Sequence, residues 1–173
     1  MAKLRKMLGA ADSPYILSLM SLIETQSKTT IGDWCVDYAE KYILNIYEKA
    51  FPEDDRLRLA VEAYRSYRKG ELKLPELKKA VALTVQAAKE AEKNPAAQAA
   101  ARTIGQAIGA VYTPTHSLGF YGAAAIAYDR VGLEEKPEVY DQIAAQECAK
   151  MEEALRACMV ENEKNPAKIK WYC

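Results

Sequence analysis

A long uncharged stretch in the second half of the chain constrains the fold more than any other feature. The 26 residues from Thr103 to Tyr128 carry no formal charge, although charged residues make up 28% of the chain. Ala and Gly are frequent in this stretch, Pro114 divides it, and its centre holds the only histidine of the sequence, His116. Because small uncharged residues let helices pack closely, we expect two buried helices joined by a short turn, at the centre of a helical domain.

Prolines and glycines predict where the helices begin and end. Pro14, Pro95 and Pro137 each suit the first turn of a helix, where the missing N–H group costs nothing. Apolar residues then recur at the 3.6-residue period of a helix, and Gly70 and Gly132 suit helix ends. The expected helices span approximately residues 14–23, 29–46, 53–69, 75–92, 95–112, 116–131 and 137–165.

These elements predict an all-α fold, because no strand pattern is present. We expect one domain over residues 1–173, a bundle of about seven mostly antiparallel helices with short connections and the Ala/Gly-rich hairpin at its centre. Helix pairs of roughly 35 to 40 residues follow one another, so a HEAT-like pairing is an alternative arrangement. The tail at residues 168–173, KIKWYC, is expected to dock its aromatic residues on the bundle.

The apolar pattern also assigns individual residues to the interior. Leu17 lies on the apolar stripe of the first helix, and Cys158 lies on that of the last. Gly105 and Gly109 are four residues apart, and Gly119 and Gly122 are three apart. Glycine inside a helix costs about 1 kcal/mol relative to alanine, so we expect close approach of neighbouring helices to offset that cost.

Charge and cysteine content exclude several kinds of partner. Lys plus Arg equals Asp plus Glu, at 24 each, so the chain has no net field to attract nucleic acid or an anionic membrane. Polar residues interrupt the uncharged stretch, which argues against a membrane span, and the N-terminus lacks the pattern of a signal peptide. None of the four cysteines has a metal-like spacing, which is typical of reduced thiols in a cytoplasmic protein.

The sequence contains no recognisable catalytic motif. A phosphate-binding loop, a nucleophile elbow and a dinucleotide fingerprint are all missing, and a single histidine cannot form a multi-histidine metal site. We therefore predict no catalytic residue, no metal site and no cofactor, and a protein that is not an enzyme.

His116 is the first candidate for a binding role. Its imidazole could act as a general base or orient a ligand, because histidine changes charge near neutral pH. The alternative, which we favour, is that the ring caps a helix end or pairs with a backbone carbonyl at the turn. Only Thr113, Thr115, Ser117 and Tyr121 offer polar groups nearby in the sequence.

The segment Asp54-Asp55-Arg56-Leu57-Arg58 is the second candidate. Two acids at a helix start, followed by two arginines, could bind a divalent ion or a carboxylate. The alternative is a capped helix start with an ion pair between Asp54 and Arg58, four residues apart.

The eleven tyrosines are numerous for a chain of this length. Tyr38 with Tyr42, and Tyr64 with Tyr67, lie at helical spacing. Tyrosine is enriched at protein interfaces, but it also lies at the edge of many cores with its hydroxyl in water. We favour the core edge for these pairs and keep Tyr64 and Tyr67 as candidate contacts for a partner.

Several segments together resemble a known family. They are W-C-V-D-Y-A-E at Trp34–Glu40, P-E-D-D-R-L-R at Pro52–Arg58, A-V-E-A-Y-R-S-Y-R-K-G-E-L at Ala60–Leu72 and T-P-T-H-S-L-G at Thr113–Gly119. In this order, across roughly residues 30 to 130, the sequence resembles the small helical bacterial proteins called putative immunity proteins, of the Imm-five-like class.

The resemblance implies a role and a set of site residues. The role is a partner protein that neutralises a toxin in bacterial competition. The positions that match the family pattern are Asp54, Asp55, Arg56, Arg58 and His116. The chain departs from the pattern near Val111-Tyr112, where relatives often carry a further histidine.

Three functional hypotheses remain open at this stage. The first is a cytoplasmic, non-enzymatic protein that binds a protein partner such as a toxin through a helical face. The second is a small-molecule sensor or enzyme with a pocket around His116, completed by Arg56 or Arg58. The third is a structural homo-oligomer.

Overall fold

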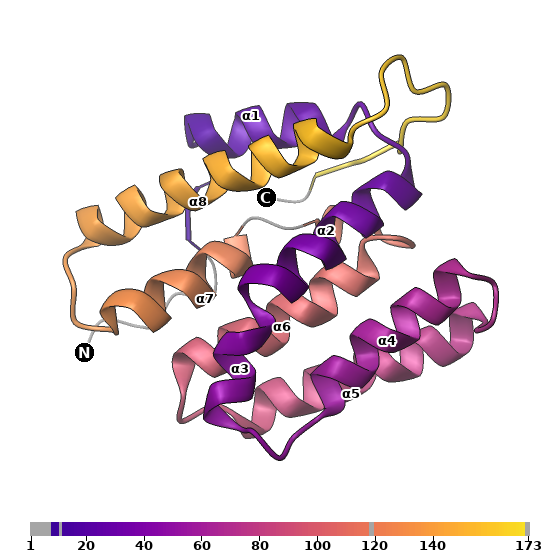
Figure 1. Ribbon diagram of the computed structural model, residues 1–173. Coiled ribbons are helices and arrows are strands. Elements are labelled where there is room, and N and C mark those ends of the chain that lie inside the picture. The colour runs from indigo at the N-terminus through magenta and orange to yellow at the C-terminus, as the bar shows by residue number, and fades with distance from the viewer. Residues whose placement is uncertain (1–7, 11, 118–119, 172–173) are drawn as a thin grey trace.

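The computed structural model describes residues 8–10, 12–117 and 120–171, and within them the chain is all-helical, with no strand. Eight α-helices and one short 3-10 helix follow one another along this part of the chain (Figure 1). They are α1 (Pro14–Ile23), α2 (Lys28–Tyr42), α3 (Leu44–Ala50), α4 (Arg56–Arg68), α5 (Leu74–Glu90), α6 (Pro95–Gly109), η1 (Pro114–His116), α7 (Phe120–Val131) and α8 (Pro137–Cys158).

Helix α6 lies at the centre of the bundle, as the uncharged stretch predicts. It packs against α2, α3, α4, α5 and α7, and ten of its fifteen residues are buried. Consecutive helices from α4 to α8 pack as neighbours, while α1 lies beside α8 at the top of Figure 1, so the first and last helices are in contact. These contacts join the elements around one hydrophobic core, and whether their pairing is HEAT-like stays a prediction.

The predicted close approach of helices is confirmed at Gly105. A β-carbon at this position would collide with the Thr84 hydroxyl of α5, so only glycine lets α5 and α6 approach this closely. At Gly32 of α2 an added β-carbon would lie 2.7 Å from the Tyr64 hydroxyl and 2.9 Å from Val111 Cβ, so this glycine leaves room for those two side chains. Of the other predicted glycines, Gly119 lies outside the described residues.

The helix expected to run to Ile46 is in fact two helices, which raises the number from about seven to eight. The chain bends at Ile43 (φ −121°, ψ −37°), whose side chain is fully buried. No proline or glycine marks this bend. Tertiary packing explains it, because the new direction lets α3 lie against α6 as well as α7.

Two further helix boundaries differ from prediction. Helix α7 begins at Phe120 rather than directly after Thr115, because η1 occupies the turn. Helix α8 ends at Cys158, seven residues before the predicted end at Asn165. There the buried Gln26 side chain accepts from the Val160 N–H (2.8 Å) and donates to the Val160 carbonyl (3.1 Å), which replaces the hydrogen bonds that a longer helix would make.

Burial differs from prediction at two apolar positions. Leu17 and Cys158 are both exposed, whereas each was expected on a buried face. The predicted docking of the tail is confirmed for Trp171, whose indole N–H donates to Glu24; Tyr172 and Cys173 lie outside the described residues. No helix in the described part of the chain has both the length and the hydrophobicity required to cross a membrane.

Candidate functional site

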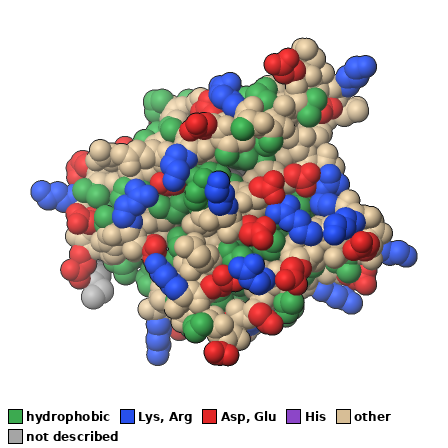
Figure 2. All heavy atoms as spheres, viewed as in Figure 1, with side chains coloured by type: hydrophobic (Ala, Val, Ile, Leu, Met, Phe, Trp, Pro, Cys, Tyr) green, Lys and Arg blue, Asp and Glu red, His purple; other side chains and the backbone are tan. Residues whose placement is uncertain are grey.

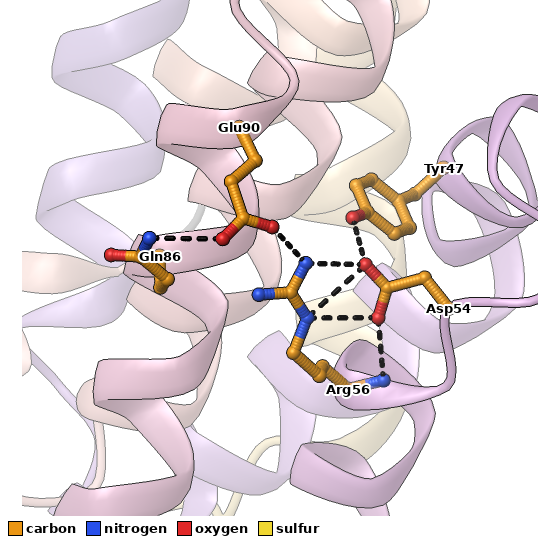
Figure 3. Close-up of polar contacts among 5 residues, drawn as sticks. All are labelled: Tyr47, Asp54, Arg56, Gln86 and Glu90. Atoms are coloured by element: carbon orange, nitrogen blue, oxygen red, sulfur yellow. Dashed lines mark hydrogen bonds and ion pairs between the residues drawn. The ribbon is translucent and has the colours of Figure 1, made fainter.

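Arg56 stands at the centre of a closed cluster of polar side chains, which we call the Arg56 cluster (Figure 3). Its guanidinium donates to both Asp54 oxygens (2.6–3.1 Å) and, on the opposite side, to Glu90 Oε2 of α5 (2.5 Å). The Tyr47 hydroxyl of α3 donates to Asp54 Oδ2 at 2.6 Å, and Gln86 completes the cluster by donating to Glu90. The Arg56 guanidinium thus links α3, α4 and α5 through the carboxylates of Asp54 and Glu90.

Asp54 also caps the start of α4, because its Oδ1 accepts from the Arg56 backbone N–H at 3.1 Å. The hydrogen bonds from Arg56 hold the pKa of Asp54 well below its usual range. Burial, together with the bond to Asp54, raises the pKa of Tyr47 to about 12. Every polar atom of the Asp54 carboxylate is engaged inside the protein, so this pair stabilises the turn between α3 and α4.

The predicted ion pair between Asp54 and Arg58 is wrong. Asp54 precedes α4, where helical spacing does not apply, and its carboxylate turns to Arg56 instead. Arg58 points to α3 and binds Glu48 (2.7 and 2.9 Å), while Asp55 is exposed and makes no side-chain cap. In the described residues no group of three His, Cys, Asp or Glu side chains is arranged to hold a metal ion.

A second polar region, which we call the α2–α4 face, joins three acids of α2 to two arginines of α4. Arg68 bonds to both oxygens of Asp33 (2.8 and 3.1 Å), and Arg65 contacts Asp37 (2.6 Å) and Glu40 (2.8 Å). Figure 2 shows acidic and basic side chains gathered over α2 and α4. Because the two helices do not pack closely along their lengths, these side chains bridge them.

Tyr64 connects the α2–α4 face to the hydrophobic core. Its side chain is fully buried, and its hydroxyl donates to Asp33 Oδ1 at 2.6 Å. Burial acts to raise the pKa of Asp33, but the hydrogen bonds from Arg68 and Tyr64 outweigh it and lower that pKa. Tyr67 is half-buried against the core. The two tyrosines are therefore core residues, and Tyr64 contacts the surface network through its hydroxyl and through its ring, whose centroid lies 6.0 Å from Arg65 Cζ.

His116 lies at the end of η1, with its Nδ1 only 3.1 Å from where a β-carbon on Gly109 would stand. The ring is half-buried, and burial lowers its pKa. No carbonyl or side chain among the described residues hydrogen-bonds the ring, so the expected carbonyl partner is not found there. Arg56 and Arg58 pair with acids rather than with His116, and a pocket that these three residues share stays a prediction.

A cavity of about 270 Å³ lies instead where α2, α3, α7 and α8 meet, and we call it the Glu147 cleft. Its walls are Tyr42, Asn45, Ile46, Ile126, Asp129, Arg130, Glu147 and Lys150. The Glu147 side chain is only 2% exposed, yet it is charged and borders the cavity. Arg130 (3.1 Å), Lys150 (3.4 Å) and the Tyr38 hydroxyl (3.3 Å) contact its carboxylate.

Sequence reasoning missed the residues of this cleft. The sequence pattern did not distinguish Glu147 from the other acids of α8, although it occurs one residue before Cys148 on the apolar side of that helix. A charge within an apolar stripe was the one available signal. The side of the cleft formed by Asn45 and Ile46 depends on the bend at Ile43, which exposes Asn45 and positions Ile46. No feature of the sequence indicates that bend.

The fold and these surfaces define a small all-helical protein whose exposed arginines are held in place by ion pairs. The chain belongs to the Imm-5 like putative immunity protein family, whose model matches residues 21–154. This range includes helices α2 to α7, both charged regions and the Glu147 cleft. Searches of the curated proteins and of the solved structures found no match.

Proposed function

We propose that this protein neutralises a toxin by binding it, as the family name suggests, and that the α2–α4 face is the contact surface. Arg65 and Arg68 of this face are partly exposed and each is held by acids of α2. Arginines that are already ordered lose little conformational entropy on binding, and arginine is enriched among the residues that dominate interface energies. This ordered pair of arginines is the observation that carries the proposal.

The mixture of charges on the face suits a protein partner. Rows of acids and arginines side by side favour a surface with the complementary pattern and disfavour a uniformly charged polymer such as nucleic acid. The buried Tyr64 packs against Gly32 and donates to Asp33, so the core holds this pattern of charges in place. The proposed action is association alone, without catalysis, in the cytoplasm.

The residues that the sequence indicated divide between this surface and the framework beneath it. Arg58 and Asp55 are exposed at the start of α4 and extend the surface toward α3. Asp54 and Arg56 hold that end of α4 in position through the Arg56 cluster. His116 remains a candidate contact by resemblance only, and a homo-oligomer remains a prediction.

The test uses the product of the gene adjacent to this one in its native genome as the binding partner. Purified full-length chain and this product are mixed in a calorimeter, and growth rescue is measured on co-expression. We expect binding, and expect the double charge reversal Arg65→Glu/Arg68→Glu to weaken it about 100-fold. The matched control reverses two exposed lysines outside the face, Lys164→Glu and Lys168→Glu.

Two results contradict the proposal. If the wild-type chain neither binds the product nor rescues growth, the neutralising role fails for that partner. If the control reversal weakens binding as much as the reversal on the face, net charge rather than this surface governs association. Circular dichroism of both variants checks that the helices are retained.

A further inference from the structure

The Glu147 cleft is separate from the α2–α4 face and has its own chemistry. It opens where α7 and α8 meet the bend between α2 and α3. Apolar side chains, Ile46 and Ile126, and the ring of Tyr42 form part of its lining. Charged groups form the rest, so the cavity can hold a ligand with one charged end and a short apolar body.

Glu147 organises the charged side of the cleft. A buried carboxylate must be neutralised, and here Arg130 and Lys150 both turn toward it. Their contacts, at 3.1 and 3.4 Å, are longer than the 2.7–2.9 Å typical of charge-assisted hydrogen bonds. Arginine has five N–H donors and lysine three, and Glu147 takes one from each, so both half-exposed groups that line the cavity have donors to offer a ligand.

The rim of the cleft is rich in positive charge. The ammonium groups of Lys41 and Lys150 both lie near the ring of Tyr42, 5.1 and 4.9 Å from its centroid. Lys49 reaches the same region by pairing with Asp129 at 2.5 Å. The lining itself carries two cations and two acids, and Lys41 and Lys49, which lie outside the lining, add positive charge beside it. The local surplus therefore favours an anion.

We propose that the Glu147 cleft binds the carboxylate of a small aliphatic acid. The outward donors of Arg130 and Lys150 take the carboxylate, and Ile46, Ile126 and the Tyr42 ring cover the carbon chain. Glu147 is a positioning residue, because it holds the two cations rather than contacting the ligand through a donor of its own. This site is independent of the proposed toxin-binding surface.

Three properties of the cleft select this ligand class. Its volume of about 270 Å³ is just below the range of pockets for drug-sized molecules, which suits an acid of a few carbons. Asp129 and Glu147 disfavour the higher charge of a phosphate. A cationic amine would have to compete with Lys150 and Arg130, which already occupy the carboxylate of Glu147.

Titration followed by NMR tests the site on the ¹⁵N-labelled full-length chain. The probes are butyrate, inorganic phosphate and butylamine, each added separately at constant ionic strength. We expect butyrate to cause saturable shifts at the amides of Asn45, Ile126 and Lys150, with a Kd of about 1 mM. Phosphate and butylamine should bind at least about 10-fold more weakly.

Matched variants assign the binding to the proposed donors. Arg130→Gln and Lys150→Gln should each weaken butyrate binding about 5- to 10-fold, because each removes one charged donor. Arg156→Gln is the control: Arg156 also pairs with an acid of α8, Glu152 at 2.8 Å, but it lies outside the cleft. Lys150 is exposed, so its variant is expected to fold even if Arg130→Gln does not.

The proposal is overturned if butyrate causes no saturable shift at the cleft, or if its shifts map elsewhere. It is also overturned if phosphate or butylamine binds more tightly than butyrate, or if Arg156→Gln weakens binding as much as Lys150→Gln. None of these outcomes changes the test of the α2–α4 face, because that test measures association with a protein through other residues.

Discussion

The Arg56 cluster and the Glu147 cleft are built from the same groups in opposite arrangements. In the cluster one arginine lies between two acids, at 2.5–2.9 Å in its shortest contacts. In the cleft one acid lies between two cations, at 3.1 and 3.4 Å. The acids of the cluster enclose its arginine from two helix ends (Figure 3), whereas the charged groups of the cleft border a cavity.

The difference shows how the same residue types stabilise the fold in one region and remain available to bind a ligand in another. A guanidinium with an acid on each side has most of its donors satisfied within the protein. A buried carboxylate accepts from two cations but uses only a few of their donors, and both cations line the cavity. The arrangement, rather than the presence of charged residues, separates the two regions.

The largest expected effect is on the cluster. Arg56→Met leaves Asp54 and Glu90 without their cation, and should lower the free energy of unfolding by about 2 kcal/mol at pH 7. Urea unfolding followed by circular dichroism measures this loss. Arg58→Met is the matched control, because Arg58 is exposed and pairs with a single acid, Glu48, and it should cost less than about 1 kcal/mol. Equal losses in the two variants would mean that the cluster is no more stabilising than a surface ion pair.

Acid should weaken the cluster in a defined pH range. The folded state holds the pKa of Asp54 below the value of about 3.9 in an unfolded chain, so its contribution is present above about pH 4 and is lost as the pH falls below it. Asp54→Asn should therefore cost about 1–2 kcal/mol at pH 7, and this difference should shrink toward pH 2. Urea unfolding at several pH values measures it, and a cost that stays constant over this range contradicts the assignment.

The ion pairs of the cleft should be weaker than those of the cluster. A double-mutant cycle with Glu147→Gln and Arg130→Gln should give a coupling energy of about 1 kcal/mol, because Arg130 is half exposed and its contact is long. The same cycle with Asp54→Asn and Arg56→Gln should give a larger coupling. A larger coupling energy in the cleft than in the cluster would mean that the Glu147–Arg130 pair stabilises the fold more than the Asp54–Arg56 pair does.

The smallest effect separates both regions from the turn at His116. Burial lowers the pKa of His116 in the folded state, so the unfolded chain binds its proton more readily and stability should fall as the pH drops below about 6.5. His116→Gln should remove this dependence. Thermal unfolding at pH 5.0 and 7.5 measures it. Neither charged region contains a histidine, so an unchanged dependence in the variant would locate the titrating group elsewhere.

Local signals in the sequence predict most of the fold. Helices begin at Pro14, Pro95 and Pro137 as expected, and Gly70 and Gly132 adopt positive φ angles of 78° and 71° just after helices. The uncharged stretch forms the centre of the core through α6 and α7. These features depend on residues within one or two turns of each other, which the sequence displays directly.

The candidate site was less predictable because its contacts are distant in the sequence. The sequence indicated Asp54 and Arg56 together. The contact of Arg56 with α5, however, is made by Glu90, which lies 34 residues after Arg56. Tyr38 meets Glu147 across 109 residues, and nothing near either residue indicates the other. The bend at Ile43 likewise follows from the packing of α3 on α6, without a proline or glycine.

The sequence by itself determined where most of the helices begin and which of them is most deeply buried, because capping, periodicity and the absence of charge act locally. Only the tertiary structure decided how the charges pair. An exposed arginine can reach acids on several elements, and burial, distance and competing partners select among them. The same balance of charges could have been neutralised entirely in closed clusters; the packing of four helices instead left the donors of Arg130 and Lys150 beside a cavity.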